Sequence, residues 1–168
     1  SDVYKRQLQR PDLGRRLNPT SVDKLTTSQN KGVDLAIVLV DGLSSTAVQN
    51  HGVALVSALV SACYDQHIST SDIFLVEHGR VAIGDEVGSA INAKSVALIV
   101  GERPGLSSPD SLGIYYTFNA KPGLTDAFRN CISNIRPAGL DISAAVKKLM
   151  WLIQESHRRK LSGVKLKD

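Results

Sequence analysis

The chain has 168 residues, of which 42% are hydrophobic and 21% are charged. This length and balance suit one compact domain with a sizeable core, and they exclude a globally disordered chain. No apolar run reaches the roughly 18–20 residues that a membrane span needs. The N-terminus also lacks the basic and then apolar pattern of a secretory signal. We therefore expect a cytoplasmic protein without a membrane partner.

The chain is basic, with a formal net charge of +4 and an isoelectric point near 9.2. Its cations are scattered except for three short clusters, and aromatic residues make up only 5% of the chain. A nucleic-acid surface usually combines clustered charge with aromatic stacking platforms. A nucleic-acid-binding protein is therefore the weakest of the functions considered, and we expect no nucleic-acid partner.

The cysteines and histidines do not predict a metal site. Cys63 and Cys131 lie far apart, and the four histidines share no spacing typical of metal ligands. Cys63 falls within an apolar helical pattern, which predicts a core residue rather than a disulfide partner.

The pattern along the chain predicts alternating strands and helices. Residues 1–7 have no pattern, so we expect them to be disordered or a remnant foreign to the domain, which we place at 8–168. Continuous apolar or aromatic runs predict strands, and period-3.6 patterns predict helices. The expected strands are 33–40, 73–76, 95–100 and 112–118, with 81–83 a short strand or extended loop. The expected helices end near residue 67, cover 85–92, and run through 142–153.

Alternating strands and helices are typical of α/β proteins. We therefore expect an α/β fold with three layers, in which helices flank a mostly parallel, Rossmann-like sheet. Residues 101–110 and 129–136 are dense in Gly, Pro, Ser, Asn and Arg, and both are predicted to be tight loops.

Ligands of such sheets gather at the carboxyl ends of the strands. Three polar segments follow predicted strands, at 41–42, 79–81 and 101–105. None has the Gly-x-Gly-x-x-Gly spacing of a dinucleotide site or the Gly-x-x-x-x-Gly-Lys-Ser/Thr phosphate loop. A nicotinamide or ATP enzyme of the usual type is therefore not expected.

Three residues in or near these segments are candidates for ligand contact, each with an alternative. Glu102 could accept hydrogen bonds from ligand amides or hydroxyls, or form a salt bridge with Arg103 or another arginine. Val81 could present a turn backbone to a ligand, or be a plain edge residue. Cys131 could touch a ligand or be a buried loop thiol. No nucleophile and base are paired in the sequence, so no catalytic residue is predicted.

At these segments the chain resembles the small (light) subunit of ethanolamine ammonia-lyase. The resemblance runs from about Leu8 to the C-terminus, with its motifs in the same order and at compatible spacing. The motifs are RPDLGRRL at 10–17, DGLS at 41–44, GRV at 79–81, GERPGL at 101–106, CISNI at 131–135, and SGV at 162–164.

The resemblance implies an adenosylcobalamin-dependent lyase that converts ethanolamine to acetaldehyde and ammonia. It implies a hetero-oligomer in which a large subunit carries substrate and catalysis, while the small subunit covers the cofactor. By motif, Val81, Glu102 and Cys131 contact the cobalamin. The family also implies a bacterial microcompartment as the location. Members usually have a longer N-terminal region, so we expect this chain to be shortened.

A second function fits the same strand ends. A stand-alone α/β module could bind a nucleotide or an acyl-phosphate there without a partner chain. Binding in the absence of any partner distinguishes it from the lyase subunit.

Overall fold

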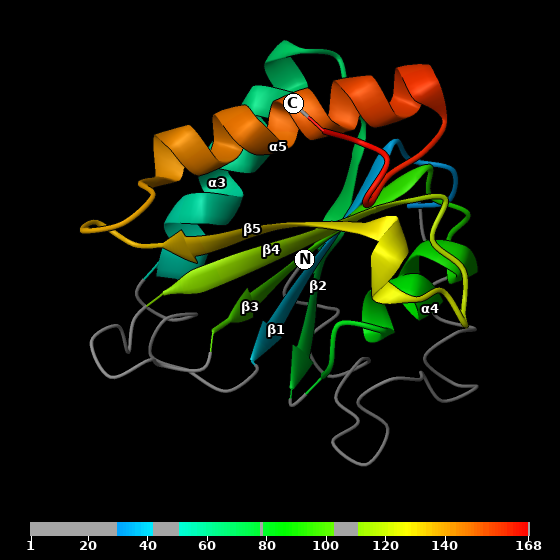
Figure 1. The fold of residues 1–168 in the computed structure, drawn as a ribbon, viewed down its shortest axis with the longest axis horizontal. Helices are drawn as coiled ribbons and strands as arrows, with labels where there is room; N and C mark the ends of the chain where they lie inside the picture. The colour runs from blue at the N-terminus through cyan, green and yellow to red at the C-terminus, as the bar shows by residue number, and fades with distance from the viewer. Residues whose placement is uncertain (1–29, 42–50, 78, 103–110, 168) are drawn as a thin grey trace.

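The computed structural model describes residues 30–41, 51–77, 79–102 and 111–167, as Figure 1 shows. These residues form five strands, three α-helices and one short 3-10 helix. In chain order they are β1 (Leu35–Asp41), α3 (Val53–Asp65), β2 (Thr70–Glu77), α4 (Ile83–Ala90), β3 (Ser95–Gly101), β4 (Leu112–Phe118), η4 (Asp126–Phe128), β5 (Arg129–Ile135) and α5 (Ile142–Arg159).

The strands form one mixed sheet in the order β2-β1-β3-β4-β5. β1 runs parallel to β2 and β3, whereas β4 is antiparallel to both β3 and β5. The α/β class is confirmed, but the prediction of a mostly parallel sheet is wrong. Only ten residues, 102–111, join β3 to β4, and residues 119–128 join β4 to β5. A parallel crossover needs a dozen or more residues, so these short links favour antiparallel neighbours.

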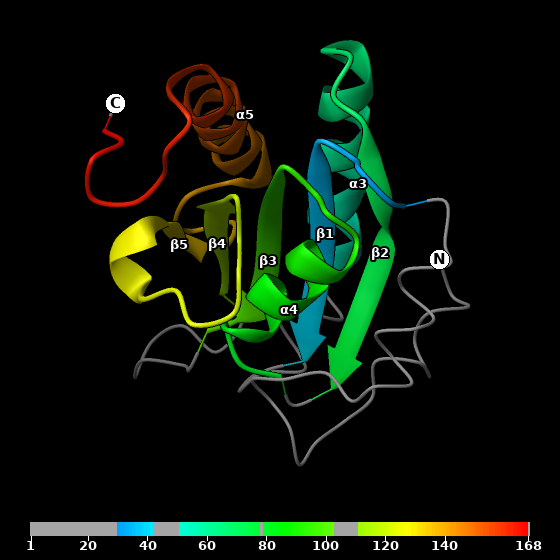
Figure 2. The ribbon, with the colours of Figure 1, turned by 90° about the vertical axis from the view of Figure 1, so that its right-hand side faces the viewer.

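Helices cover both faces of the sheet. α3 and α5 lie together on one face, and α4 lies on the other (Figures 1 and 2). One apolar cluster fills the α3–α5 side, where Leu59, Cys63 and Leu149 pack on the sheet. A second cluster, which includes Ile83 and Val87, fills the α4 side. The predicted core position of Cys63 is confirmed, because its exposure is 0%.

The central strands are buried on both faces, as their continuous apolar runs predicted. Residues 35–40 of β1 and 95–99 of β3 are all buried. Side chains of a strand alternate between its two faces, so such a run supplies both clusters at once.

Two segments differ from their predictions. The expected loop at 129–136 is mostly strand β5, and the expected strand or loop at 81–83 is a turn that enters α4. β5 escapes detection because it is an edge strand whose middle carries Asn, Cys and Ser rather than residues with high strand propensity.

A buried ion pair connects α4 to β5. Arg129 donates from Nη1 and Nη2 to the two carboxylate oxygens of Asp85, at 2.6 and 2.8 Å. Its remaining donors reach Asp126, Thr117 and the carbonyl of Leu124. The side chains of Arg129 and Asp85 are only 4% and 2% exposed. Their charges are therefore compensated inside the protein rather than by water.

His157 of α5 approaches the start of β3 from the face of the sheet opposite α4. Its Nε2 is 2.9 Å from Ser95 Oγ, which donates to the carbonyl of Asp34 at 2.7 Å. The ring also meets Phe118 edge to face, with 5.5 Å between centroids. Burial lowers the pKa of His157, while the Asp34 carboxylate opposes that shift and Lys94 and Lys160 add to it.

Removing one partner of the buried pair should be costly. Asp85→Ala leaves the Arg129 guanidinium buried without its carboxylate, so we expect a loss of about 3–5 kcal/mol in the free energy of unfolding. Asp126 also pairs with Arg129 but is 89% exposed, so Asp126→Ala should cost less than about 1 kcal/mol. Urea unfolding measures both, and equal losses would contradict the assigned role of Asp85.

The buried imidazole should make stability depend on pH. Because the folded state lowers the pKa of His157, its contribution is complete above the ordinary value of 6.5 and is lost as pH falls below it. We expect His157→Gln to reduce the drop in melting temperature between pH 7.5 and pH 5.5. His67 is exposed, and Asn tolerates its positive φ of 60°, so His67→Asn is the control. An unchanged drop in His157→Gln would refute the assignment.

Candidate functional site

The candidate site lies at one edge of the sheet, where five strand ends meet. Asp41 of β1 stands beside Glu77 of β2, and Val40 stands beside Val100 near the end of β3. Because β4 is antiparallel, it begins at this edge, and β5 ends there. The carboxyl ends of the parallel strands thus lie beside the start of β4, the place where ligands of α/β sheets gather.

Glu102 follows β3 directly and lies over the start of β4. A Cβ added to Gly113 would be only 2.9 Å from Glu102 Oε1, so the glycine makes room for the carboxylate. Oε1 then accepts a hydrogen bond of 2.8 Å from the backbone N–H of Asn134. The alternative of a salt bridge to an arginine finds no support among the described residues.

The N–H of Asn134 is available because β5 carries a bulge. Leu112 pairs with Ile135 and Ile114 pairs with Ile132, so Ser133 and Asn134 both stand opposite Gly113. Asn134 has a positive φ of 59°, which asparagine tolerates better than most residues. The bulge therefore turns one backbone donor of β5 toward Glu102.

Tyr115 and Cys131 complete a polar group on the α4 side of the sheet. They are cross-strand partners on β4 and β5. Tyr115 packs against the α4-side cluster, whereas its neighbours Ile114 and Tyr116 belong to the opposite core. A hydrogen bond joins Tyr115 to the sulfur of Cys131, and the charge of Glu102 acts on both groups.

The protein raises the pKa values of both Tyr115 and Cys131, which favours their protonated forms. Cys131 is exposed, yet the protein atoms around it raise the pKa of its thiol above 9.0, and the Glu102 carboxylate adds to the shift. The Tyr115 hydrogen bond opposes that rise. Loss of water also raises the pKa of Tyr115. Cys131 is therefore not an activated nucleophile, because nucleophilic cysteines have a lowered pKa.

Val81 lies apart from this polar group. It occupies the turn before α4, where its carbonyl accepts from the N–H of Gly84 at 3.1 Å. Its half-buried side chain packs against the same α4-side cluster as Val100 and Tyr115. The structure thus places all three candidates on the α4 side. The charge of Glu102 acts on Cys131 and Tyr115, whereas the Val81 side chain packs against the apolar cluster.

Sequence reasoning missed Tyr115 and Gly113. The strand at 112–118 was expected, and its period-2 alternation would have put 113 and 115 on one face. Which face this is depends on the position of β5, and the sequence of β5 predicts a loop. The predicted segments at 42 and 103–105, and the partner Arg103, lie outside the described residues.

Among the described residues of the site, no nucleophile is paired with a base. The site offers a carboxylate, a phenol and a thiol on one face of the sheet. In the part of the chain that the structure describes, no three His, Cys, Asp or Glu side chains gather as a metal site would require. No described helix has the length and apolar character needed to cross a bilayer.

The described residues define an α/β domain, with helices on both faces of a mixed five-stranded sheet. The family model for the ethanolamine ammonia-lyase light chain (EutC) matches residues 2–167. The small subunit of ethanolamine ammonia-lyase from Azotobacter vinelandii is 52% identical over 170 residues, which cover 99% of this chain and 62% of that protein. Its counterparts from Pseudomonas fluorescens SBW25 and Ralstonia nicotianae are each 51% identical, covering 96% of this chain and 59% and 61% of their own lengths.

The chain therefore belongs to the ethanolamine ammonia-lyase light-chain family, as its motifs predicted. It spans about three-fifths of the length of these relatives.

The thiol of Cys131 should respond in opposite directions to its two neighbours. Glu102→Gln removes a negative charge, so the pKa of Cys131 should fall and alkylation by iodoacetamide at pH 8 should accelerate. Tyr115→Phe removes the hydrogen bond to sulfur, so the pKa should rise and alkylation should slow. Mass spectrometry separates Cys131 from Cys63, whose thiol is buried with a pKa raised to about 11. Unchanged rates in both variants would contradict this geometry.

Proposed function

We propose that this chain acts as the small subunit of an adenosylcobalamin-dependent ethanolamine ammonia-lyase, which converts ethanolamine to acetaldehyde and ammonia. The observation that carries the proposal is the family match over residues 2–167, together with half-identical relatives named as that subunit. The site supports it, because a binding face without a nucleophile–base pair suits a chain that holds a cofactor for a partner's chemistry.

The exposed chemistry of the site fits a cobalamin. The corrin ring is large and fringed with amides, so it needs a broad surface with hydrogen-bond acceptors and donors. Glu102 supplies an acceptor, and Tyr115 and Cys131 lie beside it on the same face. Val81 adds an apolar contact from the turn before α4. We assign Val81, Glu102 and Cys131 to the cofactor-binding surface and propose no catalytic residue in this chain.

The role of these residues is to bind and to shield. Bound adenosylcobalamin supplies the radical chemistry through homolysis of its cobalt–carbon bond. Glu102 is held in place by Asn134, so its carboxylate is already oriented before a ligand arrives. The raised pKa of Cys131 keeps the thiol protonated and therefore less reactive toward oxidants.

The partner is the large subunit, as the name of the relatives implies. We propose a hetero-oligomer in which that subunit carries the substrate and the catalytic groups. We further propose that the assembled enzyme works in the cytoplasm, within a bacterial microcompartment.

Reconstitution tests the proposal. This chain should co-purify with a family large subunit and produce acetaldehyde from ethanolamine only when both chains and adenosylcobalamin are present. A chain that binds a nucleotide or an acyl-phosphate alone, and forms no complex, would replace the proposal with the stand-alone module.

Substitution of Glu102 tests the cofactor surface. In the assembled enzyme, Glu102→Ala should weaken cobalamin retention about tenfold, which matches the loss of one hydrogen bond to a charged group. Glu102→Gln keeps an acceptor oxygen and should retain more cofactor than Glu102→Ala. Absorbance of the bound cofactor after gel filtration measures retention, and unchanged retention in Glu102→Ala would remove Glu102 from the surface.

A further inference from the structure

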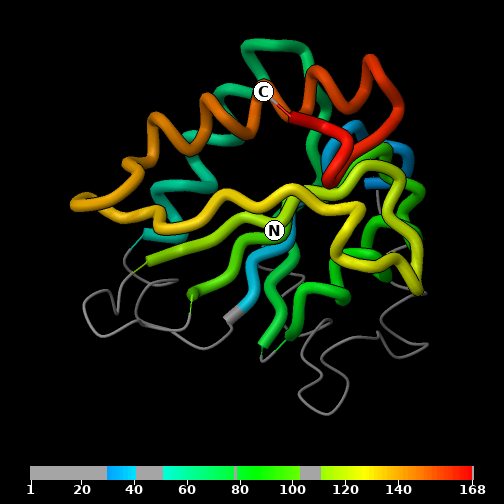
Figure 3. The backbone as a smooth tube through the Cα atoms, in the orientation of Figure 1, coloured from blue at the N-terminus to red at the C-terminus, as the bar shows by residue number. Residues whose placement is uncertain are grey.

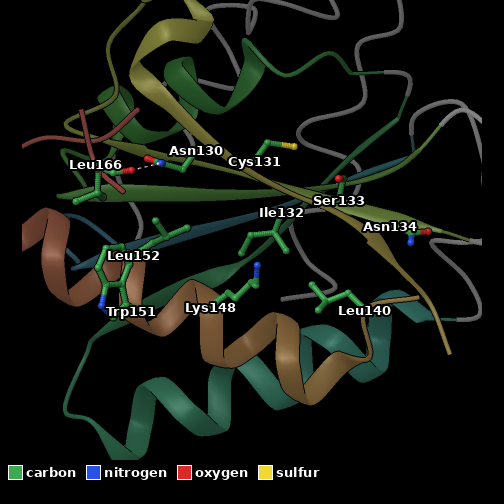
Figure 4. A pocket seen from close by; sticks show the side chains of 10 residues that line it. All are labelled: Asn130, Cys131, Ile132, Ser133, Asn134, Leu140, Lys148, Trp151, Leu152 and Leu166. Carbon is green, nitrogen blue, oxygen red and sulfur yellow. Dashed lines mark hydrogen bonds between the residues drawn. The ribbon is translucent and has the colours of Figure 1, made fainter. Parts of the chain in front are cut away.

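A cleft of about 350 Å³ opens between β5 and α5 (Figure 4). We call it the notch. Its floor is the outer edge of β5, and its walls come from α5 and from two segments that meet the strand ends. The residues that line it include Ile132, Ser133, Leu140, Lys148, Trp151 and Leu166.

The chain after α5 covers the start of β5 and the residues just before it. Figure 3 follows this segment as it returns from α5 toward the start of β5. The Asn130 side chain accepts from the N–H of Gly163 at 2.6 Å and donates to the carbonyls of Gly163 and Leu166. Val164 N–H donates to the carbonyl of Ala127. Gly163 has a positive φ of 94°, and a Cβ there would collide with the backbone of Ala127 and Phe128.

The last part of the edge is covered by the turn at 136–140. Leu140 N–H donates to the carbonyl of Asn134 at 2.9 Å, and Arg136 N–H donates to the carbonyl of Leu140 at 3.0 Å. Leu140 also forms an isolated bridge with Ile135. This turn closes the second end of the notch.

The middle of the edge, residues 131–133, has no such cover within the described part of the chain. β5 is the last strand of the sheet, so its outer backbone groups face the notch rather than another strand. Proteins usually cover or blunt a free strand edge, because it can pair with another chain. Here both ends are covered by specific hydrogen bonds and the centre is left accessible.

The walls carry one cation and one large aromatic group. Among the described residues that line the notch, Lys148 is the only charged one, and its nitrogen points from α5 toward β5 in Figure 4. None of the ion pairs among the described residues includes it. Trp151 follows one turn later on α5. Exposed Lys165 and Lys167 flank Leu166, so the surroundings are positive as well.

The notch is continuous with the candidate cofactor surface. Cys131 is one of the residues that line the notch, but its sulfur points away from α5 (Figure 4). The side chain lies on the α4 side of the sheet, beside Tyr115. Ile132, the next residue, points toward α5. A partner chain that covers a cofactor beside Cys131 therefore needs to extend only across β5 to reach the notch.

We propose that the notch binds an extended acidic segment of the large subunit. The segment adds its backbone to the free middle of β5, places a carboxylate against Lys148 and packs an apolar side chain on Trp151. Strand addition of this kind takes affinity from backbone hydrogen bonds and specificity from side-chain pockets. Charge complementarity and continuity with the cofactor surface identify the occupant, and the inference rests on the proposed function.

Charge reversal on α5 provides a matched test. Lys148→Glu should weaken association with the large subunit at least tenfold in titration of the two purified chains. Lys147→Glu makes the same charge change at the neighbouring exposed residue, which does not line the notch, and should leave the affinity within about twofold. Circular dichroism checks that both variants fold. Equal affinities of Lys148→Glu and wild type would overturn the proposal.

Crosslinking identifies the occupant directly. A photoreactive benzoyl-phenylalanine in place of Trp151, the only tryptophan of the chain, should crosslink to an acidic peptide of the large subunit. The same probe in place of exposed Gln154 on α5 should not. Crosslinks from position 151 only to a second copy of this chain, or only to a large-subunit segment without acidic residues, would overturn the proposal.

The two proposals fail differently. If wild type and Lys147→Glu do not bind the large subunit, the proposed function fails and the notch loses its partner with it. If both bind and Lys148→Glu binds equally well, the subunit role stands and only the notch is wrong.

Discussion

The buried pair of Asp85 and Arg129 is the interaction on which the other features of the sheet depend. Burying two charges is costly, and the cost is offset here because Arg129 also donates to Asp126, Thr117 and the carbonyl of Leu124. The pair joins the helix on one face to the outermost strand, across the width of β3 and β4. It thereby ties the first residue of β5 to α4.

From that starting point, successive residues of β5 take different tasks. Asn130 holds the chain after α5, Cys131 lies beside Tyr115 on the α4 side, Ile132 enters the core and Asn134 orients Glu102. Period-2 alternation separates the two faces, and the bulge at 133–134 adds a third direction. The polar residues Arg129, Asn130 and Asn134 of β5 each form specific hydrogen bonds with a neighbouring segment. This explains why its polar sequence looks like a loop.

The sequence anticipates the parts of the fold that burial determines. The runs at 33–40 and 95–100 predict central strands because a strand covered on both faces must be apolar throughout, and the 142–153 pattern predicts most of α5. The composition of a strand is the same in either orientation, and the signal for antiparallel neighbours lies instead in the short links 102–111 and 119–128. Glu102 was selected from its place after β3, but its partner Asn134 is a backbone group 32 residues away. Such a contact depends on register and bulge geometry, which local patterns do not contain.

Because the chain after α5 covers the start of β5, the order in which the two segments are synthesised affects how the chain folds. Asn130 and Gly163 are 33 residues apart, so β5 is made well before the segment that protects it. Until that segment arrives, the growing chain carries an open strand edge beside an incomplete core, a state that favours pairing between nascent chains. Its polar composition, with Asn130, Ser133 and Asn134 in place of β-branched residues, limits that risk during the interval. The polar residues that make β5 hard to recognise as a strand thus also help to keep the nascent chain soluble until the segment after α5 has been synthesised.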